Sequence, residues 1–337
     1  MKQAALIGLG MVSDTFADAL ARSDRVTLAA VHARSAESRA AFVARHPGPC
    51  AVARLAEVAE DPSIDFVILA TPPNARSEIV ATLAAAGKPI LMEKPVERTL
   101  AAALSVVETC EAAGVPLGIV FQHRTRDVTR ALRDRLPELG PLQAVEVQIP
   151  WWRPQGYYDQ PGRGSFAQDG GGVLLTQAIH MLDLMVWLAG PVASVNATMS
   201  TTGLHRMEGE DFVSAALRFG NGAVGSLMAS TASFPGRPET LTLHGLHGSA
   251  RLAQGVLTLD WHDGRSETVG QDAASGAGAD PMAFTSDWHR AVIEDFAAAL
   301  DGGRPPLVTG RSALAVHRLI AAMETSGRTG TWETVTT

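Results

Sequence analysis

A glycine-rich turn near the N-terminus has the residue types of a phosphate-binding loop. An apolar run from Ala4 to Gly8 leads into Gly-Leu-Gly-Met-Val-Ser, and a helical pattern follows from Asp14 to Ala21. Glycines between a strand and a helix let backbone N–H groups meet a pyrophosphate at little steric cost. Ser13 stands at the third position of G-x-G-x-x-G, where glycine or alanine is usual. The turn predicts a dinucleotide site, and the alternative is an ordinary strand-to-helix turn. The predicted contacts are Gly8, Leu9, Gly10, Met11 and Val12.

The segment about 20 residues further on bears on the choice of nucleotide. NAD sites usually carry an acid there for the ribose hydroxyls, but residues 31–35 read Val-His-Ala-Arg-Ser. Arg34 and Ser35, with Arg39 one helical turn later, could hold a 2′-phosphate beside His32. This pattern favours NADP(H), with NAD(H) as the alternative. A surface arginine at the start of a helix is the simpler interpretation of Arg34.

A single lysine stands where a buried strand ends. Ile90 to Met92 read as a strand, and Glu93-Lys94-Pro95 follows. Lysine is costly in such a place unless it stays near water or has a task, and proline cannot continue a strand ladder. The stretch is therefore either an ordinary strand exit or a rigid mount for one amine.

A helical pattern in the second half carries polar residues on one face. The apolar spacing from Val173 to Leu188 is helical, and Thr176, His180 and Asp183 fall at i, i+4 and i+7. Three polar residues on one face indicate that this face is not packed entirely in the core. The simpler alternative for His180 is a core histidine that is hydrogen-bonded to the backbone. The preceding loop, 151–172, holds aromatic rings, arginines and many glycines, and it is too long for a simple connector. Tyr157 and Arg163 of this loop are candidate ligand contacts.

The elements that must position these residues alternate along the first 120 positions. Short apolar runs alternate with amphipathic helical stretches, which predicts parallel β-α-β units. Ligands of such sheets bind at the carboxyl ends of the strands. The residues expected at that edge are Gly8 to Ser13, His32 to Ser35, Thr71-Pro72-Pro73-Asn74, Glu93 to Pro95, and Gln122-His123-Arg124.

Beyond Arg124 the pattern changes to short alternating strands between 142 and 259, with a hairpin turn at Asn221-Gly222. This predicts an open, mostly antiparallel sheet with a helix on one face, whose other face would serve a homodimer or homotetramer. A flexible loop is expected at 273–279, and two helices at 284–300 and 310–326. The expected domains are 1–122 and 123–337, with the last helix able to return to the first domain.

The bulk composition excludes several classes of protein. The chain has 337 residues with a formal net charge of −7, which disfavours nucleic-acid binding. Its two cysteines show no metal-ligand spacing and suggest a reducing compartment, so we expect a cytoplasmic protein without a metal. No apolar run reaches the roughly 18 residues of a membrane helix. A signal peptide over the first residues is the alternative at the N-terminus, but the glycines at 8 and 10 interrupt its apolar run.

Taken in order, the motifs resemble those of the glucose–fructose oxidoreductase/inositol dehydrogenase (Gfo/Idh/MocA) family nearly end to end. The motifs are Gly8-x-Gly10, Thr71-Pro72-Pro73, Glu93-Lys94-Pro95, Arg163-Gly164, Gly170-Gly171-Gly172, and His180 with Asp183. The resemblance implies a Rossmann domain followed by an α/β domain with an open sheet used for oligomerisation. It also implies NAD(P)-dependent oxidation or reduction at a carbinol carbon, usually of a sugar, cyclitol or related polyol.

The resemblance also assigns roles to particular residues. Lys94 is similar to the family's active-site lysine, and His180 shares its proton transfer across the substrate. Thr176 stands where the family often has an aspartate, and a threonine cannot hold a negative charge near neutral pH. The expected catalytic residues are Lys94, His180 and Thr176, with His123, Tyr157 and Asp183 as further substrate contacts. The expected cofactor contacts beyond the two N-terminal segments are Thr71, Pro72, Pro73, Asn74, Glu93, Lys94, Gln122 and Arg163.

Two other functions stay open on the same fold. One is a lyase or glycosidase that uses bound NAD transiently, with no net redox change. The other is a nucleotide-binding protein without catalysis. Retained Lys94 and His180 argue against the second.

Overall fold

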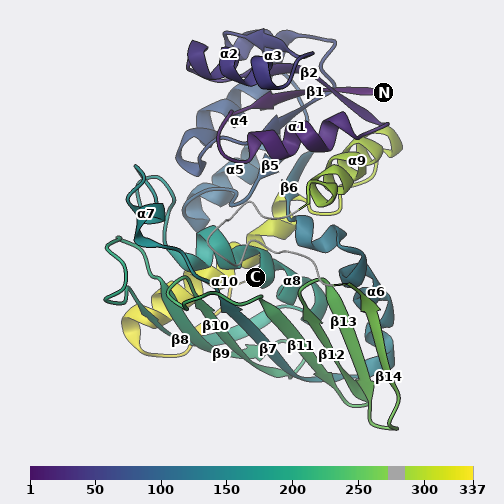
Figure 1. Ribbon diagram of the computed structural model, residues 1–337, viewed down its shortest axis with the longest axis vertical. Coiled ribbons are helices and arrows are strands. Elements are labelled where there is room, and N and C mark those ends of the chain that lie inside the picture. The colour runs from purple at the N-terminus through teal and green to yellow at the C-terminus, as the bar shows by residue number, and fades with distance from the viewer. Residues whose placement is uncertain (272–284, 337) are drawn as a thin grey trace. The chain divides into compact units, whose positions relative to one another are not determined.

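The chain folds into two compact units (Figure 1). The computed structural model describes residues 1–271 and 285–336. Unit 1 comprises Met1–Gln122 with Ser286–Leu314, and unit 2 comprises His123–Thr285 with Ala315–Thr337. The predicted second domain, 123–337, wrongly included 286–314. The predicted loop 273–279, and residue 284 at the start of a predicted helix, lie outside the described residues.

Unit 1 is built on a six-stranded parallel sheet in the order β3-β2-β1-β4-β5-β6, a doubly wound fold that confirms the predicted parallel β-α-β units and Rossmann domain. Its strands are β1 (Lys2–Ile7), β2 (Val26–His32), β3 (Cys50–Val52), β4 (Phe66–Leu69), β5 (Ile90–Glu93) and β6 (Leu117–Val120). Its helices are α1 (Ser13–Ala21), α2 (Ala36–Arg45), α3 (Leu55–Glu60), α4 (Arg76–Ala85), α5 (Leu100–Ala112) and α9 (Asp287–Gly302). The order reverses between β1 and β4, and ligands of such sheets bind beyond the strand ends at that point. The sequence analysis assigned no residues to β3 or α3, because three and six residues are too few to show a periodicity.

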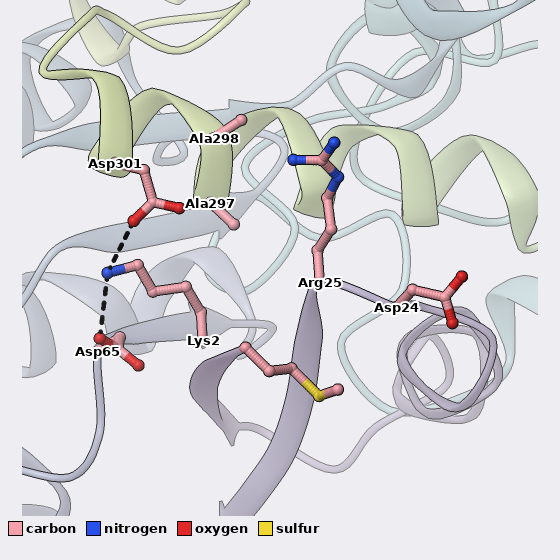
Figure 2. A pocket seen from close by; sticks show the side chains of 8 residues that line it. Lys2, Asp24, Arg25, Asp65, Ala297, Ala298 and Asp301 are labelled. Carbon is pink, nitrogen blue, oxygen red and sulfur yellow. Dashed lines mark hydrogen bonds and ion pairs between the residues drawn. The ribbon is translucent and has the colours of Figure 1, made fainter.

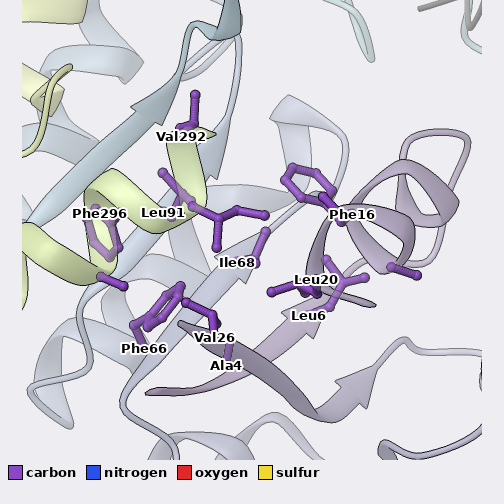
Figure 3. Close-up of a cluster of buried hydrophobic side chains, with 14 of the residues drawn as sticks. Ala4, Leu6, Phe16, Leu20, Val26, Phe66, Ile68, Leu91, Val292 and Phe296 are labelled. Atoms are coloured by element: carbon purple, nitrogen blue, oxygen red, sulfur yellow. The ribbon is translucent and has the colours of Figure 1, made fainter. Parts of the chain in front are cut away.

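The core of unit 1 joins the first strands to a segment almost 300 residues later in the chain (Figure 3). Val292, Ile293 and Phe296 of α9 pack among Phe16, Phe66 and their neighbours, and the Phe66 and Phe296 rings meet edge to face at 5.3 Å. The returning segment also pairs with β6, where the Ile119 N–H donates to the Val308 carbonyl. The last helix, α10 (Gly310–Thr329), was predicted as the returning one. It is α9, with only the first residues of α10, that belongs to unit 1.

Unit 2 is built on a nine-stranded sheet in the order β14-β13-β12-β11-β7-β10-β9-β8-β15. The strands are β7 (Leu142–Pro150), β8 (Val192–Ser200), β9 (Phe212–Phe219), β10 (Val224–Ser230), β11 (Thr240–Gly245), β12 (Gly248–Ala253), β13 (Val256–Trp261), β14 (Ser266–Gly270) and β15 (Glu333–Thr334). Among the described strands of this sheet, β7 and β10 are the one parallel pair, so the predicted mostly antiparallel sheet is confirmed. The edge strands β14 and β15 were not predicted.

Helices cover one face of this sheet. Helix α8 (Ile179–Ala189) packs on β7 and β11, and α6 (Asp127–Arg135) packs on β12, β13 and β14. Along β7, Val145, Val147 and Ile149 are fully buried, whereas Glu146, which points to the other face, is exposed. The period-two alternation therefore records a sheet with one covered and one open face.

The polar helix of the sequence analysis is not a regular α-helix. A π-helical turn over Leu174–Ala178 precedes α8, whereas the apolar spacing predicted one continuous α-helix from 173 to 188. Such turns hold one extra residue and are frequent at functional sites. Apolar spacing alone could not reveal it, because the change depends on how the Gly171-Gly172 backbone packs. An added Cβ at Gly172 would lie 1.8 Å from the Glu210 carbonyl oxygen.

Candidate active site

The turn after β1 has a conformation that only glycine allows. Gly8 has φ +98°, and an added Cβ would lie 2.7 Å from the backbone of Ala70 and Thr71 at the end of β4. This close approach brings the ends of β1 and β4 together. Thr71 Oγ1 is buried there and has no hydrogen-bond partner among the described residues.

Gly10 differs from Gly8, because an added Cβ there would meet no atom within 4 Å. Helix α1 begins just beyond it with no side-chain cap. The Ser13 hydroxyl turns back and donates to the Gly10 carbonyl over 2.6 Å, so this buried serine fits the place of a third glycine. Open space before an uncapped helix N-terminus fits the pyrophosphate of a dinucleotide.

The loop after β2 uses most of its polar groups internally. Arg39 donates from Nη1 to the Ala33 and Arg34 carbonyls, at 2.5 and 3.2 Å. Ser35 caps α2, accepting from the Ser38 N–H at 3.0 Å and donating to the Glu37 carboxylate at 2.6 Å. Arg34 is exposed. The structure thus adds an acid, Glu37, which the sequence analysis overlooked because it lies beyond the usual window.

His32 has a similar internal contact, since its Nδ1 lies 3.0 Å from the Val52 carbonyl oxygen of β3. That contact orients the ring toward the neighbouring strand. Contacts of His32, Ser35 and Arg39 with a cofactor stay predictions.

Arg76 links the two turns that follow β4 and β5, and sequence analysis missed it. Its guanidinium donates to the Thr71 carbonyl at 3.0 and 2.8 Å, and also to the Glu93 and Pro95 carbonyls on either side of Lys94. The side chain is buried, and burial lowers the pKa of Arg76 to about 10, against the opposing effect of Glu93 and Glu97. An arginine at the start of the helix after Thr-Pro-Pro was the only signal of this role.

Glu93 itself has a partner inside unit 1. Its carboxylate lies 3.5 Å from His289 Nε2 on α9, and the His289 ring meets Phe16 edge to face. The side chain therefore packs against α9, and its contact with a cofactor stays a prediction. Lys94 follows directly, and a cis peptide joins it to Pro95.

In unit 2, the turn after Gln122 is attached to one face of α8. Arg124 donates to both carboxylate oxygens of Asp183, at 2.8 and 2.6 Å, and both side chains are buried. The His123 ring stacks on the His180 ring, with centroids 4.9 Å apart and an interplanar angle of 25°. Burial raises the pKa of Asp183, and the bonds from Arg124 oppose that shift. Both Asp183 oxygens accept from Arg124, and the expected contact of Asp183 with substrate stays a prediction.

Thr176 lies within the π-helical turn. Its hydroxyl donates to the Gly172 carbonyl at 2.6 Å and contacts the Gln177 side chain. This hydroxyl helps to shape the start of the helix that carries His180. A role for Thr176 at the substrate stays a prediction.

The long loop of unit 2 is anchored by polar contacts. The Arg163 guanidinium lies over the Tyr157 ring at 5.3 Å, and its Nη1 lies 3.7 Å from Asp169. The adjacent tyrosine, Tyr158, is buried and bonds Thr231 over 2.6 Å. Tyr157 is therefore the half-exposed ring of the pair, as a substrate contact requires.

The predicted residues thus form two groups. Gly8, Thr71 and Lys94 lie at the carboxyl edge of the unit 1 sheet, as predicted from the alternation. His123, His180 and Asp183 lie together in unit 2. The approach of Lys94 and His180 to one substrate stays a prediction.

A hollow of about 340 Å³ in unit 1 lies at the opposite edge of the sheet (Figure 2). Lys2, the first residue of β1, bridges Asp65 and Asp301 there, at 3.3 and 3.1 Å. Since ligands of doubly wound sheets bind at the carboxyl edge, we assign this hollow no role in the chemistry.

Within 1–271 and 285–336, no three His, Cys, Asp or Glu side chains are grouped to hold a metal ion. Over the same residues, every helix is too short or too polar to cross a membrane.

Two family models match successive parts of the chain. The model described as "Oxidoreductase family, NAD-binding Rossmann fold" matches residues 2–121. The model described as "GFO/IDH/MocA C-terminal domain" matches residues 130–251.

Individual proteins are similar over nearly the whole length. The rhizopine catabolism protein MocA of Rhizobium meliloti is 29% identical over 323 residues, which cover 94% of this chain and 92% of that protein. The 1,5-anhydro-D-fructose reductase of Ensifer adhaerens is 27% identical, over 93% and 92%. Among solved structures, the WlbA dehydrogenase from Bordetella pertussis in complex with NADH and UDP-GlcNAcA has a TM-score of 0.85 and 27% identity, covering 100% of this chain and 98% of that one.

Proposed function

Because the chain belongs to the Gfo/Idh/MocA family of NAD-binding oxidoreductases, we propose that it transfers hydride between a nicotinamide cofactor and a carbinol or carbonyl carbon of a sugar, cyclitol or related polyol. Relatives whose names state an anhydrosugar or inositol as substrate support the substrate class. The single observation that carries the proposal is the shared sheet edge. There, Arg76 joins the Thr71 turn to the Lys94 turn, and Gly8 packs on the first of them.

The residues at this edge suit a dinucleotide. We assign the pyrophosphate to the backbone of the turn from Gly8 to Val12, and the remaining contacts to the turns after β2, β4, β5 and β6. When bound, the nicotinamide supplies the acceptor or donor of the hydride.

The protein's own side chains must transfer the proton of the reacting hydroxyl group. As a carbinol is oxidised, its C–H bond breaks with both electrons leaving as hydride, and the O–H proton must go to a base. We assign this proton to Lys94 Nζ, with His180 as the second group that holds it. Thr176 carries no charge near neutral pH, so it cannot replace either.

Cofactor binding is the first test. The purified chain is titrated with NADPH, NADP⁺, NADH and NAD⁺, with nucleotide fluorescence and thermal shift as readouts. Binding of a reduced nucleotide, followed by its turnover with polyols or their keto forms, is expected. A chain that binds none of the four contradicts the proposal. Tightly retained NAD with no net redox change would instead favour the lyase or glycosidase.

A substitution then tests the lysine. Lys94→Met should lower kcat by about 10²–10⁴-fold, the usual size of a general acid–base contribution, and leave nucleotide affinity within a few-fold. Unchanged kcat in this variant would remove Lys94 from the mechanism.

For the cofactor class, we propose NADP(H), with NAD(H) as the alternative. The exposed Arg34 guanidinium supports a 2′-phosphate, whereas the nearby Glu37 carboxylate would repel one. Arg39 is occupied by loop carbonyls and adds little.

We also propose a homodimer or homotetramer formed through the open face of the nine-stranded sheet, in a reducing compartment such as the cytoplasm. Exposed residues on that face include small or polar ones such as Ser214 and Ala216, which allow a second sheet to approach. Native mass measurement should give two or four copies. Ala216→Arg should reduce that number, whereas Asp263→Arg, in an exposed hairpin turn, should not.

A further inference from the structure

Arg126 connects two side chains that the sequence did not link. Its Nη1 lies 3.3 Å from Glu239 Oε1, and its Nη2 lies 2.5 Å from His123 Nε2. Trp151 Nε1 donates to the other Glu239 oxygen over 3.2 Å. Arg126 and Glu239 are both buried, and 113 residues separate them in the chain.

The contact with His123 determines the protonation of that ring. A guanidinium has only donors, so Nε2 of His123 must be the acceptor. The proton of a neutral imidazole then sits on Nδ1, and a second proton on Nε2 would have to displace Arg126. His123 is therefore held neutral in one tautomer.

The His123 ring also stacks against the His180 ring. The two rings stack at 4.9 Å, and the next residue, Arg124, holds Asp183 one helical turn along α8. A neutral His123 lets His180 take up a proton without a like charge stacked against it. A protonated His123 would oppose that step.

We infer that Arg126 and Glu239 are positioning residues for proton transfer, because they hold His123 as the neutral Nδ1–H tautomer beneath His180. This inference rests on the proposed acid–base role of His180. Among the described residues of unit 2, two buried ion pairs involve the residues next to His123 and His180: Arg124 with Asp183, and Arg126 with Glu239.

The first experiment needs no activity. Long-range ¹H–¹⁵N spectra of the full-length protein, labelled with ¹⁵N-histidine, separate the two neutral tautomers from the cation. The His123 signals are assigned by their loss in His123→Gln. We expect the His123 proton on Nδ1. We also expect no titration of His123 between about pH 5.5 and 9, a range in which an ordinary histidine changes charge. A His123 that is Nε2–H, or that titrates near 6.5 like a free histidine, overturns the inference.

The second experiment links the network to catalysis. Arg126→Gln with Glu239→Gln removes both charges of the pair, and a glutamine can offer either a donor or an acceptor to His123. In this double variant His123 should titrate. The limb of the kcat/KM profile that is missing in His180→Gln should move to lower pH by roughly one unit or more.

Arg130→Gln is the matched control, because Arg130 is exposed on α6, the helix that begins directly after Arg126, and this variant should leave the profile unchanged. A double variant that folds with the wild-type pH profile contradicts the positioning role. If the double variant does not fold, the tautomer of the wild-type protein still decides. If the wild-type chain turns over no polyol, the proposed function fails while the tautomer is read independently.

Discussion

Three buried arginines organise the residues expected to do chemistry. Arg76 holds the turns around Thr71 and Lys94, Arg124 holds α8 through Asp183, and Arg126 holds His123. Each guanidinium donates to a carbonyl, a carboxylate or an imidazole nitrogen of a residue at least three positions away in the chain. Guanidinium groups suit this task, because they stay charged and donate in several fixed directions.

The two charged residues after β2 give a prediction at the same scale. Arg34→Ala should weaken NADPH binding about tenfold or more, since it removes a charge-assisted hydrogen bond to the 2′-phosphate, and should change NADH binding little. Glu37→Gln should act in the opposite direction and strengthen NADPH binding. Titration of both reduced nucleotides with both variants checks this. If Arg34→Ala weakens NADH as much as NADPH, no 2′-phosphate contact exists.

Glu210 and Glu324, which lie close to the backbone of Gly171 and Gly172, give a prediction about the pH dependence of stability. Glu210 accepts from the Gly172 and Leu174 N–H groups, and an added Cβ at Gly171 would lie 4.0 Å from oxygens of both Glu210 and Glu324. Burial and the Glu210 charge raise the pKa of Glu324 to about 7, against a weaker effect of Arg328. The folded state then holds more protons than the unfolded state between about pH 4.5 and 7, so stability should fall as pH rises through this window.

Glu324→Gln removes this titration. The variant should be more stable than wild type at pH 8 by about 1–2 kcal/mol, a value reduced for partial exposure. The difference should shrink toward pH 4.5. Urea unfolding across this pH range measures it, and the exposed Asp134→Asn on α6 is the control. If the free energy of unfolding changes with pH equally in wild type and Glu324→Gln, Glu324 ionises normally.

At the scale of elements, the turn between β1 and α1 separates two uses of glycine. Gly8 is required by the fold, because its φ is positive and the end of β4 leaves no room for a side chain. Gly10 has room for a side chain, so only a bound ligand would exclude a side chain at this position.

The two alanine variants should therefore differ. Gly8→Ala should lower the free energy of unfolding by about 2 kcal/mol or more. Gly10→Ala should leave it nearly unchanged but weaken nucleotide binding about tenfold or more, because a methyl group would occupy the space of the pyrophosphate. Unfolding curves and nucleotide titrations on both variants check this. Normal nucleotide binding by Gly10→Ala would move the pyrophosphate elsewhere.

The attachment of α8 gives a second prediction for an element. Asp183→Asn leaves the buried Arg124 without its counter-charge, and breaking one side of a buried pair costs about 3–5 kcal/mol. The thermal midpoint should fall clearly, and activity should fall with it if His180 depends on this helix. Asp159→Asn, an exposed residue of the long loop, should change neither. An unchanged midpoint in Asp183→Asn would mean that Arg124 does not secure the helix.

At the scale of the whole molecule, unit 1 is discontinuous in sequence. Residues 1–122 alone lack α9, which supplies Val292, Ile293 and Phe296 to the core. That fragment should aggregate or bind a dye for exposed apolar surface. The same fragment joined by a flexible linker to 286–314 should unfold cooperatively. Cooperative unfolding of 1–122 by itself would show that α9 is dispensable.

The alternation of strands and helices, the open sheet and most helix ends followed from sequence alone. These features depend on local periodicity and turn residues, which neighbouring positions record. The same holds for the sheet edge on which Gly8, Thr71 and Lys94 lie, since parallel topology brings strand ends together. Their chemistry stays a prediction.

Tertiary structure alone decided the rest. The partners of Arg76 and Arg126 and the return of α9 depend on contacts that no local pattern encodes, such as the contact of Arg126 with Glu239, 113 residues away. The π-helical turn before α8 arises where the Gly172 backbone meets Glu210. A buried charge is stable only where a distant partner compensates it, so its meaning appears only once the chain is folded.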